Sequence, residues 1–168
     1  LIFSAGNSGP GILSLTRPKA AKNLIATANI ENLRSDLTAT ADNMEDLRFT
    51  SSRGPTADGR IKPDLTAPGT GITGGRSGPS ALNGNIDAAH RWSTGTSHAA
   101  PQVAAAAALF TQFWKPGHDG QNPSPAMIKA ALLNGTVDMN GADTSAPRPN
   151  GNEGWGRIML TNVLATGA

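Results

Sequence analysis

Alanine dominates the stretch that most constrains this chain, residues 99–114. It follows a Gly-Thr-Ser-His turn and reads AAPQVAAAAALFTQFW. Alanine has the highest helix propensity of all residues, so the stretch predicts an α-helix. Helix propensity alone does not require small residues at nearly every position. We therefore expect the helix to pack tightly on all sides, as the central helix of a larger α/β domain does.

Ser97 stands at the start of this expected helix, after Gly95 and Thr96. A hydroxyl in the first turn of a helix lies beside free backbone N–H groups and the positive end of the helix dipole, which favour negative charge. Acyl transfer develops negative charge on an oxygen, so Ser97 is a candidate nucleophile, and Gly95 lets backbone or substrate come close. Serine is also a common helix cap. The local turn leaves both interpretations open.

The composition fits one globular domain and excludes several classes of protein. The 168 residues are 38% apolar, enough for a core, and no stretch approaches the roughly 20 apolar residues of a membrane span. The net charge is +2, with 14 basic and 12 acidic residues spread along the chain, so we expect neither a nucleic acid nor a membrane as partner. Cysteine is absent, which excludes a disulfide framework and a thiolate metal site.

Short apolar runs and one capped segment predict further elements. Residues 1–3 and 24–28 are apolar and bounded by turn residues, which is typical of buried parallel strands. Ser124 followed by Pro125 predicts the N-cap and first residue of a second helix, and Gly135 its end. The expected core face of this helix consists of Met127, Ile128, Ala131 and Leu132.

Residues 95–104, GTSHAAPQVA, resemble the serine-nucleophile signature of the subtilisin-like proteases, the subtilases. Four further segments resemble that family in the family's own order, and together they span almost the whole chain. They are LIFSAGNSG at 1–9, AAKNLIATA at 20–28, FTSSRGP with KPDLTAPG at 49–55 and 62–69, and SPAMIKAAL with GNEGWGR at 124–132 and 151–157. The third is especially close to the alkaline, oxidant-resistant branch. The resemblance implies an α/β fold, the later half of a three-layer subtilisin-like domain with a mostly parallel sheet and a central alanine-rich helix.

The same resemblance assigns roles to particular residues. Ser97 would be the nucleophile of a serine endopeptidase that hydrolyses peptide bonds through an acyl-enzyme. Asn7 would donate a hydrogen bond to the oxyanion, and Ser4, Ala5 and Gly6 would form part of one wall of the first specificity pocket. The expected substrate is a protein or peptide, and the expected location is extracellular.

The chain starts at Leu1, inside a strand pattern, without an initiator methionine or a signal peptide. In subtilases the catalytic Asp and His precede the oxyanion Asn, so the resemblance implies that residues 1–168 are a partial catalytic domain that lacks both. A serine hydroxyl is a weak nucleophile until an imidazole accepts its proton. We therefore expect this chain alone to be inactive, and its missing N-terminal half to be its partner.

The histidines of the chain are not expected to replace the missing base. His98 is adjacent to the candidate nucleophile, and neighbouring positions on a helix point in different directions. His90 and His118 are expected in loops, facing solvent. Asp64 and Asp87 are expected to make local backbone hydrogen bonds in turns, as aspartate commonly does.

Two positions depart from the family's pattern without touching the expected nucleophile or oxyanion donor. His98 stands where methionine is usual, which removes a side chain that loses function on conversion to its sulfoxide. Ala105 replaces a common glycine and should stiffen the helix.

The resemblance requires no cofactor, although a structural calcium ion is a family-level expectation. No segment has a dense carboxylate loop of the EF-hand kind, so no metal ligand is assigned. Two rival functions stand beside the protease. One is a catalytically dead subtilase-like module used for binding or scaffolding. The other is an α/β-hydrolase, which is disfavoured because its nucleophile elbow requires glycine two residues after the serine, where this chain has Ala99.

Overall fold

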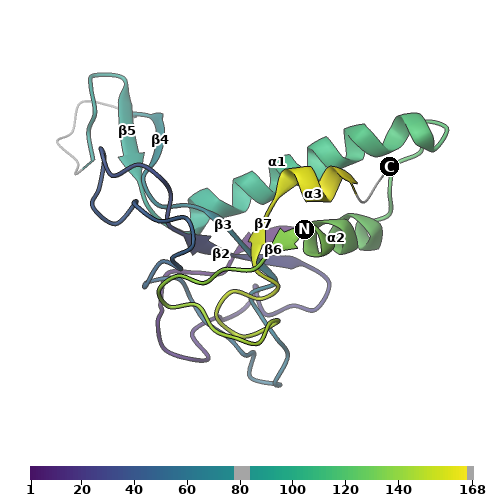
Figure 1. Ribbon diagram of the computed structural model, residues 1–168, viewed down its shortest axis with the longest axis horizontal. Helices are drawn as coiled ribbons and strands as arrows, with labels where there is room; N and C mark the ends of the chain where they lie inside the picture. Colours follow the sequence, from purple (N-terminus) through teal and green to yellow (C-terminus); the bar gives the residue numbers. More distant parts are fainter. Residues whose placement is uncertain (78–83, 166–168) are drawn as a thin grey trace.

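The computed structural model describes residues 1–77 and 84–165, and their strands form a five-stranded sheet and a two-stranded hairpin (Figure 1). In chain order the elements are β1 (Ile2–Ser4), β2 (Ile25–Ile30), β3 (Leu65–Pro68), β4 (Ile72–Gly75), β5 (His90–Ser93), α1 (Thr96–Trp114), the 3-10 turn η1 (Lys115–Gly117), α2 (Pro125–Asn134), β6 (Thr136–Val137), β7 (Arg157–Ile158) and α3 (Leu160–Ala165).

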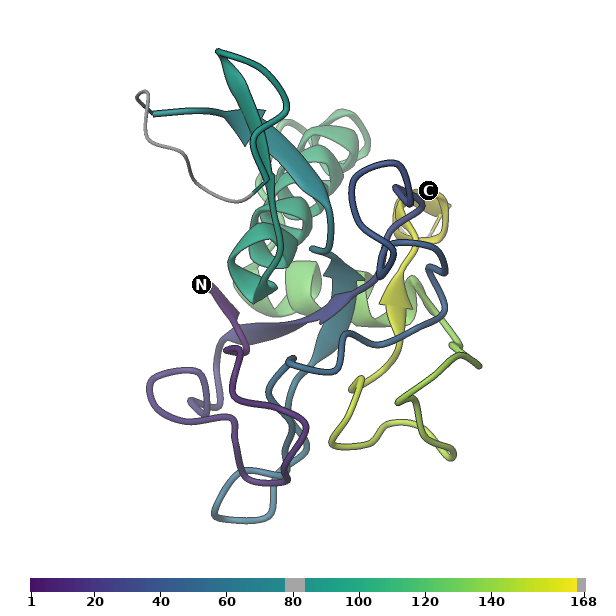
Figure 2. The same ribbon diagram turned by 90° about the vertical axis from the view of Figure 1, so that its left-hand side faces the viewer.

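The main sheet has the strand order β1-β2-β3-β7-β6. The first four strands of that order pair in parallel, and only β6 runs antiparallel, against β7. This confirms the expected α/β fold with a mainly parallel sheet. The hairpin of β4 and β5 projects from the body of the molecule and leads directly into α1 (Figure 2). The fold thus places the start of α1 at the end of an antiparallel strand.

Strand β2 divides the core because its residues alternate between the two faces of the sheet. On one face Ile25 packs in a cluster with Val103, Phe110 and Leu132 from the helices. On the other face Ala26, Ala28 and Ile30 pack against side chains of the connecting loops, such as Leu47. Helices therefore cover one face of the sheet and long loops cover the other (Figure 1).

Helix α1 is buried along one stripe, so the expectation that it packs on all sides is wrong for the part of the chain described. Its buried residues recur every three to four positions, which is the spacing of one helix face. They are Thr96, Ala99, Val103, Ala106 and Phe110. The opposite side is exposed at Pro101, Gln102, Ala104, Ala105 and Ala108. The buried stripe packs on the core cluster, and on the exposed side the Gln102 side chain donates a hydrogen bond to the Pro68 carbonyl at 3.2 Å.

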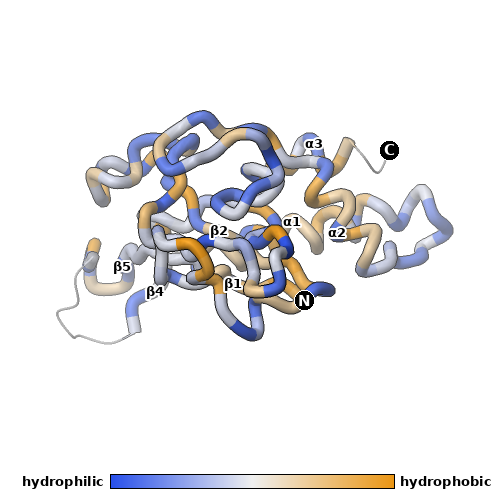
Figure 3. Tube along the Cα trace, turned by 90° about the horizontal axis from the view of Figure 1, so that it is seen from below, coloured by the Kyte–Doolittle hydropathy of each residue, from blue (hydrophilic) through white to orange (hydrophobic). Residues whose placement is uncertain are grey.

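The second helix begins and ends where local sequence chemistry predicts. The Ser124 hydroxyl accepts a hydrogen bond from the Met127 N–H at 3.1 Å, Pro125 is the first helical residue, and the Gly135 N–H donates to the Ala131 carbonyl at 3.0 Å. The expected core face is correct for three of its four residues, because Ala131 and Leu132 are buried and Ile128 packs against the core, whereas Met127 is 41% exposed. Met127 lies one turn nearer the loop from α1, which is mostly hydrophilic (Figure 3).

Among residues 1–77 and 84–165, no helix combines the length and the apolar character needed to cross a lipid bilayer.

Candidate active site

The turn between β5 and α1 brings Ser97 to the surface in the first turn of the helix. The Gly95 N–H donates to the Gly69 carbonyl at 2.9 Å, which ties this turn to the end of β3. A Cβ on Gly69 would lie 2.5 Å from Asn29 Oδ1 and 2.7 Å from the Gly95 carbonyl oxygen. Because no side chain fits there, the close approach requires glycine at position 69.

Asn7 is joined to the residue that precedes Ser97. Its Oδ1 accepts hydrogen bonds from the Thr96 N–H at 3.0 Å and from the Thr96 hydroxyl at 3.1 Å. The same hydroxyl oxygen accepts a bond from the Gly6 N–H at 3.1 Å, and Thr96 is completely buried. This arrangement uses the oxygen of the Asn7 amide. Its Nδ2 donates no hydrogen bond to any residue within the described ranges.

Two possible hydrogen-bond donors adjoin Thr96: the side-chain Nδ2 of Asn7 and the backbone N–H of Ser97. At the start of α1, the Thr96 N–H is bound by Asn7 and the His98 N–H donates to the Gly95 carbonyl at 3.0 Å. The N–H groups of the first turn of a helix lack intrahelical partners. For Ser97, no bond from its N–H to a group outside the helix occurs among the described residues. Hydrogen bonds to protein groups in the described ranges thus leave both the Ser97 N–H and Asn7 Nδ2 available to a ligand.

The expected pocket wall lies at the end of β1. Ser4 is half-buried, and Ala5 is fully buried with its N–H bonded to the Thr27 carbonyl at 2.8 Å. A ligand at this wall would therefore meet the backbone of Ala5 and not its side chain. Gly6 has a φ of +105°, and a Cβ on it would lie 2.9 Å from Lys19 Nζ. Sequence analysis missed Lys19, since nothing in the local pattern relates it to Gly6.

The three histidines lie in three different environments. His98 is half-buried and lines a hollow of about 200 Å³ beneath the β4–β5 hairpin. His90 begins strand β5 instead of lying in a loop, and its Nδ1 is 2.9 Å from a carboxylate oxygen of Asp87. His118 is half-buried and does not face solvent freely, because its ring stacks on Trp114 with centroids 3.5 Å apart. In the described part of the chain, none of them forms a hydrogen bond with Ser97.

Asp87 and Asp64, both expected to bond locally in turns, have different hydrogen-bond partners. Asp87 accepts bonds from the Ala89 and His90 N–H groups, both at 2.7 Å, so its expected local turn is confirmed.

For Asp64 the expectation of a local turn is wrong. Its carboxylate is buried, accepts a bond from the Ala26 N–H at 2.7 Å, contacts the buried Lys62 ammonium, and lies 2.8 Å from Lys129 Nζ. Both ammonium groups also donate to the Leu24 carbonyl, at 2.9 and 3.0 Å. Two buried charges require partners, so Asp64 joins β2, β3 and α2 instead of closing a turn.

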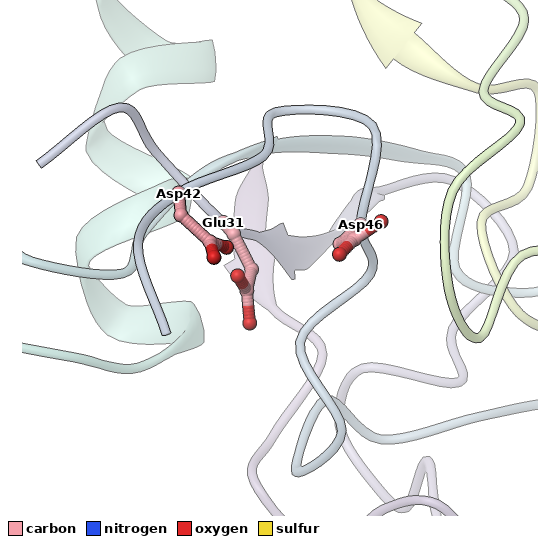
Figure 4. Close-up of side chains that lie close together, drawn as sticks. All are labelled: Glu31, Asp42 and Asp46. Atoms are coloured by element: carbon pink, nitrogen blue, oxygen red, sulfur yellow. The ribbon is translucent and has the colours of Figure 1, made fainter. Parts of the chain in front are cut away.

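Three carboxylates form a cluster just after the end of β2. Glu31, Asp42 and Asp46 each offer an oxygen, and these atoms lie within 4.8 Å of one another (Figure 4). Burial raises the pKa of Glu31, and the charges of Asp42 and Asp46 raise it further, whereas Arg48 at 3.4 Å lowers it. Asp46 already accepts bonds from the Asn43 side chain and the Ala142 N–H. Protein donors thus reach Glu31 and Asp46. The expected structural calcium ion stays a prediction.

The chain belongs to the subtilase family, whose sequence profile matches residues 1–156. It is 34% identical over 134 residues to the serine protease/ABC transporter B family protein tagA of Dictyostelium discoideum, which covers 69% of this chain and 7% of that protein. It is also 34% identical over 140 residues to the serine protease AprX of Bacillus subtilis, covering 79% of this chain and 29% of AprX.

A solved structure shares the fold. The crystal structure of a lanthipeptide protease superposes with a TM-score of 0.71 at 23% identity, over 99% of this chain and 50% of that one. The chain therefore spans half of the length of this structural relative, and less than a third of the two curated relatives.

Proposed function

We propose that Ser97 is the nucleophile of a serine endopeptidase and that Asn7 Nδ2 and the Ser97 N–H stabilise the oxyanion. The observation that carries this proposal is the pair of hydrogen bonds from Thr96 to Asn7 Oδ1, at 3.0 and 3.1 Å. They hold the amide one residue away from an exposed serine. Each donor of this kind contributes about 3–4 kcal/mol to the stabilisation of the transition state in subtilisins.

The reaction follows from these positions. Ser97 Oγ attacks the carbonyl carbon of the scissile peptide bond while an imidazole accepts its proton, and the carbonyl oxygen becomes the oxyanion between the two donors. The imidazolium then protonates the leaving amine, and the C–N bond breaks to leave an acyl ester on Ser97. Water, deprotonated by the same imidazole, hydrolyses that ester. The substrate is a protein or peptide, and the chemistry requires no cofactor.

The imidazole is proposed to come from a segment outside these 168 residues, together with the carboxylate that orients it. The placement of the three histidines supports this, since none of them is hydrogen-bonded to Ser97 within the described ranges. Strand β1 is at the edge of the sheet, and the exposed side of α1 is rich in alanine. These two apolar surfaces are where the missing N-terminal half of the catalytic domain would dock.

The activity of the isolated chain tests whether the catalytic base comes from outside these 168 residues. Without the base, residues 1–168 alone are expected to hydrolyse a casein-derived fluorogenic peptide no faster than their Ser97→Ala variant. Addition of the separately expressed upstream half should restore hydrolysis. Rapid Ser97-dependent turnover by the isolated chain would contradict the proposed origin of the base.

The full-length protein tests the function itself. Ser97→Ala should abolish peptide hydrolysis, whereas Ser8→Ala, which removes an exposed hydroxyl from the loop after Asn7, should leave the rate unchanged. The same measurement decides the alternative, a catalytically dead binding or scaffolding module. That alternative requires wild-type and Ser97→Ala proteins to be equally inactive. The family resemblance also supports an extracellular location for the active protein.

A further inference from the structure

Residues 5–24 form the loop that joins β1 to β2 (Figure 2), and this loop contains Lys19. The Lys19 ammonium reaches Gly6 at the candidate substrate wall. Lys19 Nζ is 2.9 Å from the position that a Cβ on Gly6 would occupy. Gly6 has a φ of +105°, which favours glycine, and the absence of a side chain there leaves room for the ammonium. Lys19 is half-buried, so its charge is less screened than that of a fully exposed lysine.

This ammonium has no internal partner. Among the described residues, Lys19 Nζ makes no ion pair within 4.0 Å and no hydrogen bond. Residues 1–30 contain three cations, Arg17, Lys19 and Lys22, and no aspartate or glutamate. An anionic ligand near Gly6 would give this ammonium a counter-ion.

A second polar group faces the same point. Ser52 Oγ is also 2.9 Å from the position of a Gly6 Cβ, and Ser52 is fully buried. Its oxygen accepts a bond from the Ser8 N–H at 3.0 Å. Because Ser52 is fully buried, its hydroxyl lies behind Gly6, and the Lys19 ammonium is the donor that an arriving carboxylate would meet.

We infer that Lys19 binds the carboxylate of an acidic side chain, glutamate or aspartate, on the acyl side of the scissile bond. This inference rests on the proposed function, because Gly6 immediately precedes Asn7. When the scissile carbonyl oxygen is held at Asn7, the side chain of the same substrate residue extends along Ser4, Ala5 and Gly6 and meets Lys19. The carboxylate and ammonium then form a charge-assisted hydrogen bond. Lys19 is thus a specificity-determining residue for acidic peptides.

The test uses the full-length protein and fluorogenic peptides that differ only in the residue before the scissile bond, glutamate, glutamine, leucine or lysine. The wild-type protein should cleave the glutamate peptide with a kcat/KM about tenfold higher than the glutamine peptide, and this ratio should fall with added salt. Lys19→Gln should bring the ratio close to one. Lys19→Arg should retain most of the preference because it keeps the charge.

Lys22→Gln is the matched control, since Lys22 is exposed and belongs to the same loop. It should leave the glutamate-to-glutamine ratio unchanged, and thermal unfolding should show that both glutamine variants remain folded. If Lys19→Gln keeps the wild-type ratio, or if the wild-type protein cleaves both peptides equally, the role of Lys19 is wrong while the protease remains. If no peptide shows Ser97-dependent cleavage, the proposed function fails and this inference fails with it.

Discussion

Asn7 and Thr96 fix each other's orientation at the start of α1. Both the N–H and the hydroxyl of Thr96 donate to Asn7 Oδ1, and the hydroxyl in turn accepts from the Gly6 N–H at 3.1 Å. An amide whose oxygen accepts two bonds has a defined rotamer, so its nitrogen is presented in one position. Under the proposed function, Asn7 would contact the oxyanion and Thr96 would position the Asn7 amide.

Replacing Asn7 by alanine should lower kcat by about 100- to 1000-fold and leave KM nearly unchanged. The reason is that the oxyanion exists in the transition state and not in the bound substrate. Steady-state kinetics of the full-length protein on a peptide ester and a peptide amide checks this. An increase in KM with kcat unchanged would mean that Asn7 acts in substrate binding alone.

Thr96→Val removes the hydroxyl but keeps the size of the side chain and the backbone N–H bond to Asn7. We expect kcat to fall by roughly tenfold, the equivalent of about 1.4 kcal/mol, with little change in KM, because the amide is then held by one bond instead of two. Thr111→Val removes a different hydroxyl bond of the same helix, to the Ala107 carbonyl, and serves as the control. Equal kcat values for the two variants would deny Thr96 its positioning role.

Asp64→Asn should destabilise the protein by about 3–5 kcal/mol, because it leaves the buried Lys62 ammonium without its counter-charge. Burial lowers the pKa of Lys62, and the bond with Asp64 opposes that effect. Urea unfolding of the full-length protein measures the loss. Asp58→Asn, at an exposed pair with Arg60, should leave the urea midpoint unchanged. Equal midpoints for the two variants would mean that Asp64 is not a structural anchor.

Glu153 should make stability fall as the pH rises above the ordinary glutamate range. Burial raises the pKa of Glu153 above 4.5, although hydrogen bonds from Asn150 and Ser145 and the charges of Arg148 and Arg53 oppose it. From about pH 4.5 up to the raised pKa the folded state binds more protons than the unfolded state, so the free energy of unfolding decreases with pH in that window. The free energy of unfolding of the Glu153→Gln variant should decrease less over the same pH window. Parallel curves for wild type and variant would contradict this.

His98→Met should make the full-length protein lose activity faster in hydrogen peroxide, because the thioether beside Ser97 is converted to a polar sulfoxide. His118→Met places the same side chain after η1, beyond the C-terminal end of α1, and is the control. Residual activity against time in peroxide gives the two rates. Equal inactivation of His98→Met and wild type would remove the proposed benefit of His98.

Local chemistry allowed much of the fold to be predicted from the sequence. Helix α2 follows from Ser124, Pro125 and Gly135, because caps and breakers act within a few residues. The start of α1 near Ser97 follows in the same way from alanine propensity. The parallel arrangement of β1 and β2 agrees with their apolar runs.

The parts that escaped prediction depend on residues far apart in the sequence. The local sequence predicts a turn at Asp64, yet the partners of Asp64, Ala26 and Lys129, are 38 and 65 positions away. In the sequence, Lys19 is one of several cations in a loop, and nothing near it predicts its position. Only the folded backbone brings Lys19 close to Gly6. The one-sided burial of α1 was missed because alanine fits a buried and an exposed face equally well.

The most direct test of the central claim is the site of covalent labelling in the full-length protein. A fluorophosphonate should phosphonylate Ser97 Oγ, and peptide mapping by mass spectrometry should locate the adduct on the peptide that contains residues 95–104. Ser97→Ala should abolish the label, and Asn7→Ala should slow it strongly. An adduct on another serine, or labelling that persists in Ser97→Ala, would contradict the account.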